Sequence, residues 1–193
     1  MVEFKNISKK YGVNGSEQTV LENFSLTISK GSKTVIMGES GIGKTTILRI
    51  AAGLEKPDGG EFFCDEKVAV MFQEPRLLPW KTALENVCAV LPKVQIPLAD
   101  KYLSAVELDC DKNKFPYELS GGMAQRVALA RLLAFAEADY STLLLLDEPF
   151  SALDDETAAK MLNLIKDFSK DRTVLIVAHH LPDIPFADEI ITL

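Results

Sequence analysis

Cysteine and histidine are scarce in this sequence of 193 residues. The three cysteines, Cys64, Cys88 and Cys110, lie far apart and form no C-x-x-C pair, and His179 and His180 are the only histidines. Disulfide frameworks and zinc sites need paired or closely spaced ligands. The sequence therefore argues against both kinds of site.

A long apolar run and an excess of positive charge are also lacking. No uncharged stretch approaches the ~20 residues of a membrane-spanning helix, and the opening residues contain no apolar segment typical of a secretory signal. Asp and Glu outnumber Lys and Arg by 28 to 21, a net charge of −7, whereas nucleic-acid binders present a basic face. We expect a cytoplasmic protein that binds no nucleic acid and reaches a membrane only through a partner.

Apolar runs alternate with helix-like segments along the chain, which predicts an α/β fold with a mainly parallel sheet. Strands are expected near 2–7, 24–28, 33–37, 61–64, 68–72, 143–146, 173–178 and 189–193, and helices near 44–54, 123–135 and 157–169. Tyr11–Glu17 is expected to be a loop. Two more helices, Thr82–Val90 and Leu98–Leu108, lie in a proline-containing segment that is typical of a helical insertion.

The stretch GESGIGKT, Gly38 to Thr45, matches the phosphate-binding pattern G-x-x-x-x-G-K-[ST] without a mismatch. It lies between a predicted strand and a predicted helix, where backbone N–H groups and the helix N-terminus can hold phosphate oxygens. Lys44 can reach the β- and γ-phosphates, and the Thr45 hydroxyl can bind Mg²⁺. A chance glycine-rich turn is the minor alternative.

Two acids, Asp147 and Glu148, end the apolar run LLLL. The carboxyl end of a parallel strand lies on the ligand side of such sheets, so Asp147 suits Mg²⁺ and Glu148 suits an attacking water. Gln73 and His179 also follow predicted strands, and Tyr11 can stack on adenine. For each of these last three residues taken alone, a polar strand end or ordinary packing is the favoured explanation.

The stretch LSGG, Leu119 to Gly122, forms a second turn of the phosphate-binding type, without a lysine, before a predicted helix. Together with GESGIGKT, LLLLDEP and SALD (Ser151–Asp154) it resembles the ATP-binding cassette (ABC) family over essentially the whole chain. Gln73 is similar to the Q-loop glutamine of that family, His179 to its switch histidine and Tyr11 to its adenine-stacking aromatic residue.

The resemblance implies an ATPase with a P-loop core, an N-terminal antiparallel β subdomain and an inserted α-helical subdomain. Residues 1–75 and 121–193 would form the core with the β subdomain, and residues 76–120 the helical subdomain. The implied ATP-binding residues are Tyr11, Gly38, Glu39, Ser40, Gly41, Ile42, Gly43, Lys44, Thr45, Thr46, Ser120, Gly121 and Gly122. The implied catalytic residues are Glu148, His179 and Gln73, and the implied Mg²⁺ ligands are Thr45, Gln73 and Asp147.

The resemblance also explains the second turn. In this family two cassettes bind head to tail, and the LSGG turn of one covers the γ-phosphate held by the other. A homodimer with two ATP sites is therefore implied. Met123 stands where glutamine is common in the family, and AHH where THD is common.

A finer resemblance lies in MFQEPRLLPWKTALENV, Met71 to Val87. It is similar to cassettes of importers for nitrate, aliphatic sulfonates and taurine, and implies contact between Arg76–Trp80 and an integral membrane permease on the inner face of the cell membrane. A separate solute-binding protein is also implied. Trp80 packing inside the helical insertion is the alternative for that residue.

Three other functions remain open at this point. They are an exporter cassette, a non-transport ABC ATPase acting in DNA repair or translation, and a P-loop small-molecule kinase. The kinase would leave LSGG and SALD unexplained.

Overall fold

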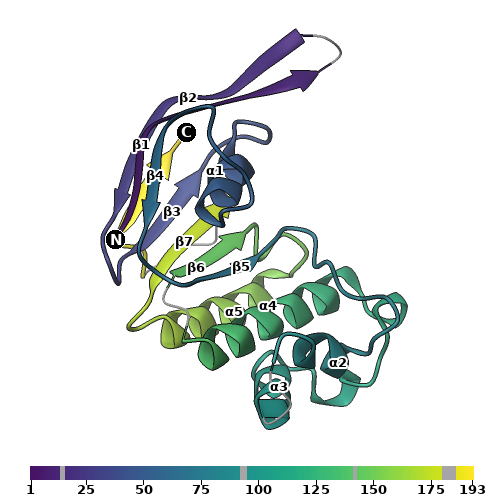
Figure 1. Cartoon of the computed structure of the whole chain (residues 1–193). Helices are drawn as coiled ribbons and strands as arrows, with labels where there is room; N and C mark the ends of the chain where they lie inside the picture. The colour runs from purple at the N-terminus through teal and green to yellow at the C-terminus, as the bar shows by residue number, and fades with distance from the viewer. Residues whose placement is uncertain (14–15, 92–94, 141–142, 180–185) are drawn as a thin grey trace.

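The fold contains an antiparallel β-sheet and a parallel β-sheet (Figure 1). The computed structural model describes residues 1–13, 16–91, 95–140, 143–179 and 186–193. An antiparallel sheet has the strand order β2-β1-β4, with β1 Val2–Val13, β2 Ser16–Ile28 and β4 Gly59–Cys64. A parallel sheet has the order β5-β6-β7-β3-β8, with β5 Val68–Met71, β6 Leu143–Asp147, β7 Thr173–Ala178, β3 Lys33–Met37 and β8 Glu189–Thr192. The predicted α/β fold, with a parallel sheet and an N-terminal antiparallel sheet, is confirmed.

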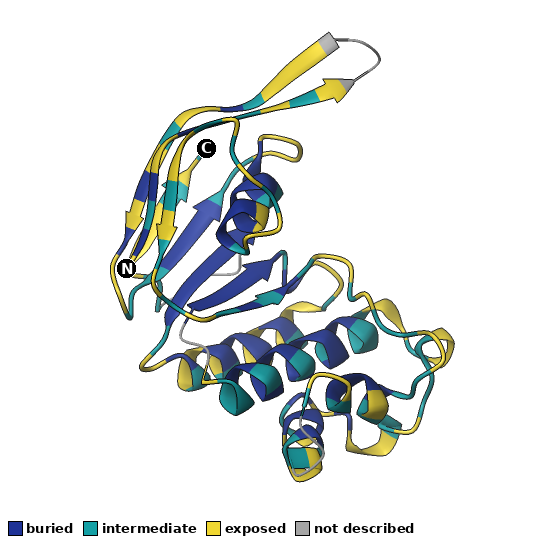
Figure 2. Ribbon diagram, in the orientation of Figure 1, coloured by how far each residue is buried: buried dark blue, intermediate teal, exposed yellow. Residues whose placement is uncertain are grey.

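Helices cover both faces of the parallel sheet. They are α1 Lys44–Ala51, α2 Ala83–Cys88, α3 Ile96–Ala105, α4 Gly121–Ala138 and α5 Asp155–Phe168. Leu143 and Leu145 share one buried cluster with α1 and the antiparallel sheet. Leu144 and Leu146 point to the opposite face and join α4 and α5. The uninterrupted apolar run of β6 is therefore explained by burial on both faces (Figure 2).

Capping side chains set the starts of three helices. The Ser120 and Asp154 side chains accept from the N–H groups of Met123 and Thr157 at the starts of α4 and α5. Thr82 and Glu85 form a reciprocal capping box at the start of α2. As a result α4 begins two residues earlier than predicted, with Gly121 and Gly122 inside its first turn.

The prediction of a loop over Tyr11–Glu17 is wrong at both ends of that range, because both ends belong to strands. Strand β1 continues to Val13, and Tyr11 pairs with Gln18 across an extended hairpin. The outer part of the hairpin is exposed on much of its surface (Figure 2), so its sequence carries little alternation of apolar and polar residues. Backbone pairing and side-chain contacts such as that of Lys10 Nζ with Glu17 Oε2, at 3.3 Å, hold it. Residues 14 and 15 of that predicted loop lie outside the described residues.

The segment 76–120 holds α2, α3 and two short 3₁₀ turns, Asp109–Asp111 and Pro116–Glu118. Helices α2 and α3 pack on α4, at the end of the molecule farthest from the β1–β2 hairpin (Figure 1). Their position agrees with the expected helical insertion, while the division of the chain into subdomains stays a prediction.

Within the described ranges, no helix has the length and apolar character needed to cross a membrane.

We predict that Leu144→Ala lowers the free energy of unfolding by about 2–5 kcal/mol, because the smaller side chain leaves a cavity between β6 and α4. Leu144 is fully buried. Urea denaturation followed by circular dichroism measures this change. Leu54→Ala is the matched control, since Leu54 is 62% exposed, and a loss as large as that of Leu144→Ala would contradict the prediction.

Candidate functional site

Strand register brings the predicted site residues to one edge of the parallel sheet. Met37 lies beside Ala178, and Asp147 lies beside Val177. Strands β3, β6 and β7 therefore end together, and the residues that follow them share one edge. In open parallel sheets this carboxyl edge is where ligands bind.

The loop from Gly38 to Gly43 connects β3 to α1 and needs glycine at its last position. Gly43 has a backbone φ of 113°, and a Cβ there would lie 2.8 Å from Leu21 Cδ2. Both the left-handed backbone and the close approach of β2 exclude a larger residue. The loop is thereby held against the antiparallel sheet.

Lys44 places a positive charge in the middle of this loop. Its side chain is buried, and Nζ donates hydrogen bonds to the carbonyl oxygens of Gly38 and Glu39, each at 2.7 Å. The ammonium group and the N-terminus of α1 both favour an anion at this position. The arrangement fits phosphate binding.

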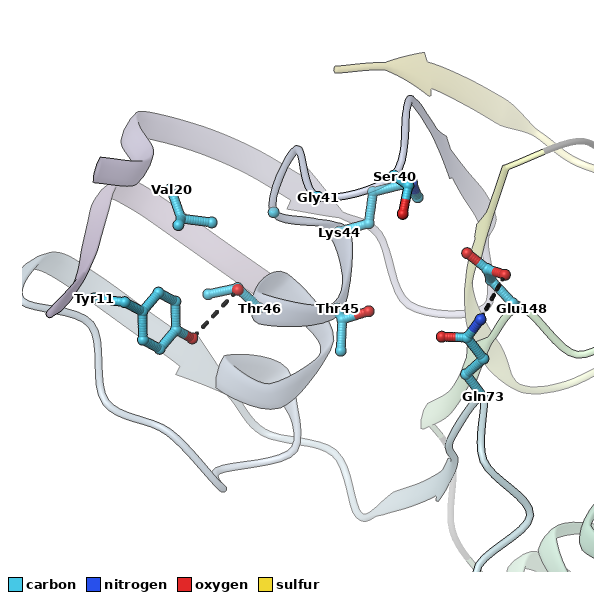
Figure 3. A pocket seen from close by; sticks show the side chains of 10 residues that line it. Tyr11, Val20, Ser40, Gly41, Lys44, Thr45, Thr46, Gln73 and Glu148 are labelled. Carbon is cyan, nitrogen blue, oxygen red and sulfur yellow. Dashed lines mark hydrogen bonds between the residues drawn. The ribbon is translucent and has the colours of Figure 1, made fainter. Parts of the chain in front are cut away.

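An open pocket of about 270 Å³ lies over the loop (Figure 3). It is lined by Tyr11, Val20, Ser40, Gly41, Gly43, Lys44, Thr45, Thr46, Gln73 and Glu148. Sequence reasoning named all of these residues except Val20, which reaches the pocket only because β2 pairs with β1. Of the predicted loop residues, Gly38, Glu39 and Ile42 do not line it, and Ile42 is 42% exposed.

The Tyr11 ring lies at one end of the pocket, away from Lys44 (Figure 3). Its hydroxyl is 3.3 Å from Thr46 Oγ1, on α1. This hydrogen bond fixes the ring relative to the phosphate loop. The aromatic face beside Val20 offers an apolar surface for a flat base.

Asp147 is buried and accepts a hydrogen bond from Thr45 Oγ1 at 3.3 Å. Burial raises the pKa of the Asp147 carboxyl above its usual range, and the nearby Glu148 charge acts in the same direction. In the described part of the chain, no three His, Cys, Asp or Glu side chains gather in a metal-binding group. A hydroxyl and one carboxylate fit Mg²⁺, which binds few protein ligands alongside substrate phosphates.

Gln73 and Glu148 meet at the other side of the pocket (Figure 3). Gln73 Nε2 donates to Glu148 Oε2 at 3.0 Å. Glu148 has a backbone φ of 45°, a left-handed conformation that costs a non-glycine residue about 1–3 kcal/mol. Strain of this kind is retained where the direction of a side chain matters, and here it turns Glu148 toward Gln73.

His179 follows β7 directly and is partly buried. Because Ala178 pairs with Met37, His179 lies at the same sheet edge as the phosphate loop, although it does not line the pocket. His180 lies outside the described residues.

The second glycine turn is separate from this pocket. Ser120 and Gly121 are exposed, and neither lines it. At Gly122 a larger residue is excluded by close packing, since a Cβ there would lie 2.8 Å from the carbonyl oxygen of Ala152. The first turn of α4 therefore packs directly against the Ser151–Asp154 segment, while Ser120 and Gly121 face outward.

The family model described as ABC transporter matches residues 21–151, which include the phosphate loop, the second turn and both acids. The chain belongs to the ABC transporter family. This ABC cassette is 33% identical to a solved ATP-binding cassette in a dimeric post-hydrolysis state bound to ADP and phosphate. That match has a TM-score of 0.91 and covers all of this chain and 94% of the other.

Curated relatives are similarly close to the cassette. An aliphatic sulfonates import ATP-binding protein of Rhodococcus jostii is 41% identical, and the match covers the whole cassette and 70% of the relative. An uncharacterized ABC transporter ATP-binding protein of Methanocaldococcus jannaschii is 36% identical, with 100% and 77% of the two chains covered.

We predict that Asp147→Asn stabilises the cassette in the absence of nucleotide. Burial raises the pKa of Asp147 on folding, so the folded state loses stability as pH rises above the pKa of this carboxyl in the unfolded chain, and an uncharged amide at this position avoids that loss. The variant should raise Tm by roughly 2–4 °C, which corresponds to ~1 kcal/mol in a chain of this size. Differential scanning calorimetry at pH 7 without Mg²⁺ measures it.

Asp167→Asn is the matched control, because Asp167 is 72% exposed and its removal should leave Tm unchanged. Adding ATP with Mg²⁺ should then raise the Tm of Asp147→Asn less than that of the natural protein. An apo Tm below that of the natural protein would show that the charge of Asp147 is not destabilising.

Proposed function

We propose that this chain is the ATP-hydrolysing subunit of an ABC importer for a small solute of the nitrate, sulfonate or taurine type. One observation carries the proposal: Gln73 and Glu148 meet beside a pocket that also contains Lys44 and Thr45. Phosphate-binding groups and a water-activating carboxylate are thus joined in one site. The names of the sulfonate-importing relatives support the importer assignment.

In the proposed complex, ATP lies along the pocket with its base on Tyr11 and its phosphates over residues 38–46. Lys44 leaves its two carbonyl partners and binds the β- and γ-phosphates. Thr45, Asp147 and Gln73 would hold Mg²⁺. When bound, Mg²⁺ supplies positive charge that neutralises the phosphate oxygens.

Glu148 is the proposed general base. Its carboxylate accepts a proton from a water placed in line with the γ-phosphate, and Gln73 holds that carboxylate in place through the 3.0 Å hydrogen bond. His179, at the same sheet edge, is proposed to donate a hydrogen bond to the γ-phosphate. Water attacks phosphorus, the bond to the β-phosphate oxygen breaks, and ADP leaves with that electron pair.

A head-to-tail homodimer completes the site in this proposal. Ser120, Gly121 and Gly122 lie at the N-terminus of α4, where backbone N–H groups and the helix dipole favour an anion. Two of the three residues are exposed and none lines the pocket of its own chain. They are therefore free to cover the γ-phosphate of a second copy.

The permease contact is proposed at Arg76–Trp80, next to Gln73 in sequence. Trp80 is 70% exposed, which disfavours the alternative that it packs inside the helical segment. Large aromatic side chains are common anchors of interfaces. The cassette would thereby be held on the inner face of the cell membrane, with a solute-binding protein as a further component.

The rival functions have less support. Importers are named among the relatives, whereas no feature of the described residues favours an exporter, and the acidic charge disfavours DNA repair or translation. A small-molecule kinase would need a phosphoryl acceptor. Phosphate release from ATP alone, without an acceptor, distinguishes the ATPase from the kinase.

We predict that Glu148→Gln lowers kcat for ATP hydrolysis by at least ~10²-fold, because the amide cannot accept the proton of water. The amide oxygen can still accept from Gln73, so binding should persist. Phosphate release measures turnover, and light scattering after size exclusion with ATP should detect a stable dimer. Turnover at the natural rate would refute the assignment of Glu148.

We predict that Trp80→Ala reduces recovery of the permease by roughly 10-fold or more, as expected for an interface anchor. The tagged cassette is extracted from its native membranes in mild detergent, and the co-purified integral membrane protein is quantified. Tyr140→Ala is the matched control, since Tyr140 is 80% exposed elsewhere on the surface. Equal recovery with both variants would exclude Trp80 from the contact, and recovery of no membrane protein even with the natural chain would contradict the transport function.

A further inference from the structure

Gln125 is a buried polar side chain that has no role in the reaction proposed for Glu148. It lies on α4, is 2% exposed, and follows the Ser120–Gly122 turn by one helical turn. A buried amide without partners would be costly, so its hydrogen bonds indicate what it holds.

The side chain of Gln125 bonds to the turn that contains Glu148. Gln125 Nε2 donates to the Glu148 carbonyl oxygen at 2.7 Å and to Ser151 Oγ at 3.3 Å. Gln125 Oε1 accepts from the Ala152 N–H at 2.9 Å. One side chain on α4 therefore bonds to both ends of the segment 148–152.

These bonds act on a strained part of the backbone. Glu148 is in the left-handed region, with φ at 45°, and its N–H donates to the Val177 carbonyl oxygen at 2.8 Å. The neighbouring β7 thus holds the N–H, while Gln125 holds the carbonyl oxygen. With both groups of the peptide backbone fixed, the Glu148 side chain has a defined direction toward Gln73.

The same helix also supports the other partner of Glu148. Arg131 on α4 donates to the carbonyl oxygens of Pro75 and Arg76, at 2.6 and 3.1 Å, just after Gln73. Helix α4 thus anchors Glu148 directly through Gln125 and the Gln73 segment through Arg131.

We propose that Gln125 is a positioning residue for ATP hydrolysis, which fixes the backbone of Glu148 and so aims its carboxylate at the attacking water. The inference rests on the proposed function, because it assigns Gln125 a role in the reaction of Glu148. Gln125 itself does not line the pocket, so its removal should alter turnover and leave nucleotide binding by the pocket intact.

The test is Gln125→Met, which keeps the length of the side chain and removes its donors and its acceptor. We expect kcat to fall roughly 10- to 100-fold, the cost of slightly misplacing a catalytic group. The dissociation constant for a fluorescent ATP analogue should stay within about twofold of the natural value, because Tyr11 and the phosphate loop are unchanged.

Arg126→Met is the matched control on the next position of α4. Arg126 Nη1 donates to the carbonyl oxygens of Val106 and Glu107, at 2.7 and 3.0 Å, so this variant also breaks side-chain bonds to backbone, but away from Glu148. Both variants should lower Tm by a few degrees. Only Gln125→Met should lower kcat; similar values of kcat in the two variants would overturn the proposal.

A double-mutant cycle with Glu148→Ala gives the second readout. If Gln125 acts through the Glu148 carboxylate, adding Gln125→Met to Glu148→Ala should change the residual single-turnover rate by less than about threefold. A further 10- to 100-fold loss would show that Gln125 acts independently of Glu148. Absence of ATP hydrolysis by the natural protein would instead refute the proposed function, before Gln125 is tested.

Discussion

The parallel pairing of β3, β6 and β7 is the constraint on which the rest of the site depends. Their register aligns Met37 with Ala178 and Asp147 with Val177, so three chain segments leave the sheet at one edge. The phosphate loop and His179 follow β3 and β7 directly, and the acidic pair lies at the end of β6, whose last residue is Asp147. Because the leucines of β6 are buried on both faces of the sheet, burial alone does not set the register, but a slip would separate the residues that share this edge.

Helix α4 is the second organising element, because it joins parts of the chain that are distant in sequence. Its first turn packs on Ala152, Gln125 bonds to the Glu148 turn, Arg126 bonds to the end of the α3 region, and Arg131 bonds to the segment after Gln73. A displacement of α4 would therefore affect the exposed Ser120 turn, Glu148 as the proposed general base, and the helical segment together.

The sequence predicted the parallel sheet and most residues of the pocket, because both depend on local patterns. Apolar runs identified β6 and β7, and the spacing of Gly38–Thr45 identified the phosphate loop. The inner parts of β1 and β2 were predicted, but their outer extension toward residues 13 and 16 was missed, since its exposed residues lack alternation. Val20 and the partners of Gln125 were missed for a related reason: they arise from contacts between elements and leave no periodic signal in either one.

Two separate requirements, one from packing and one from the proposed phosphate binding, restrict position 122 to glycine. Its backbone lies at the helix N-terminus that is proposed to bind phosphate, yet the space for a side chain is already filled by the Ala152 carbonyl oxygen of the same chain. A descendant that no longer bound ATP would still need glycine there to fold well. Glycine at this position can therefore persist in lineages after the activity is lost. Its presence in a distant relative would indicate that the fold is kept, and would not by itself indicate ATP hydrolysis.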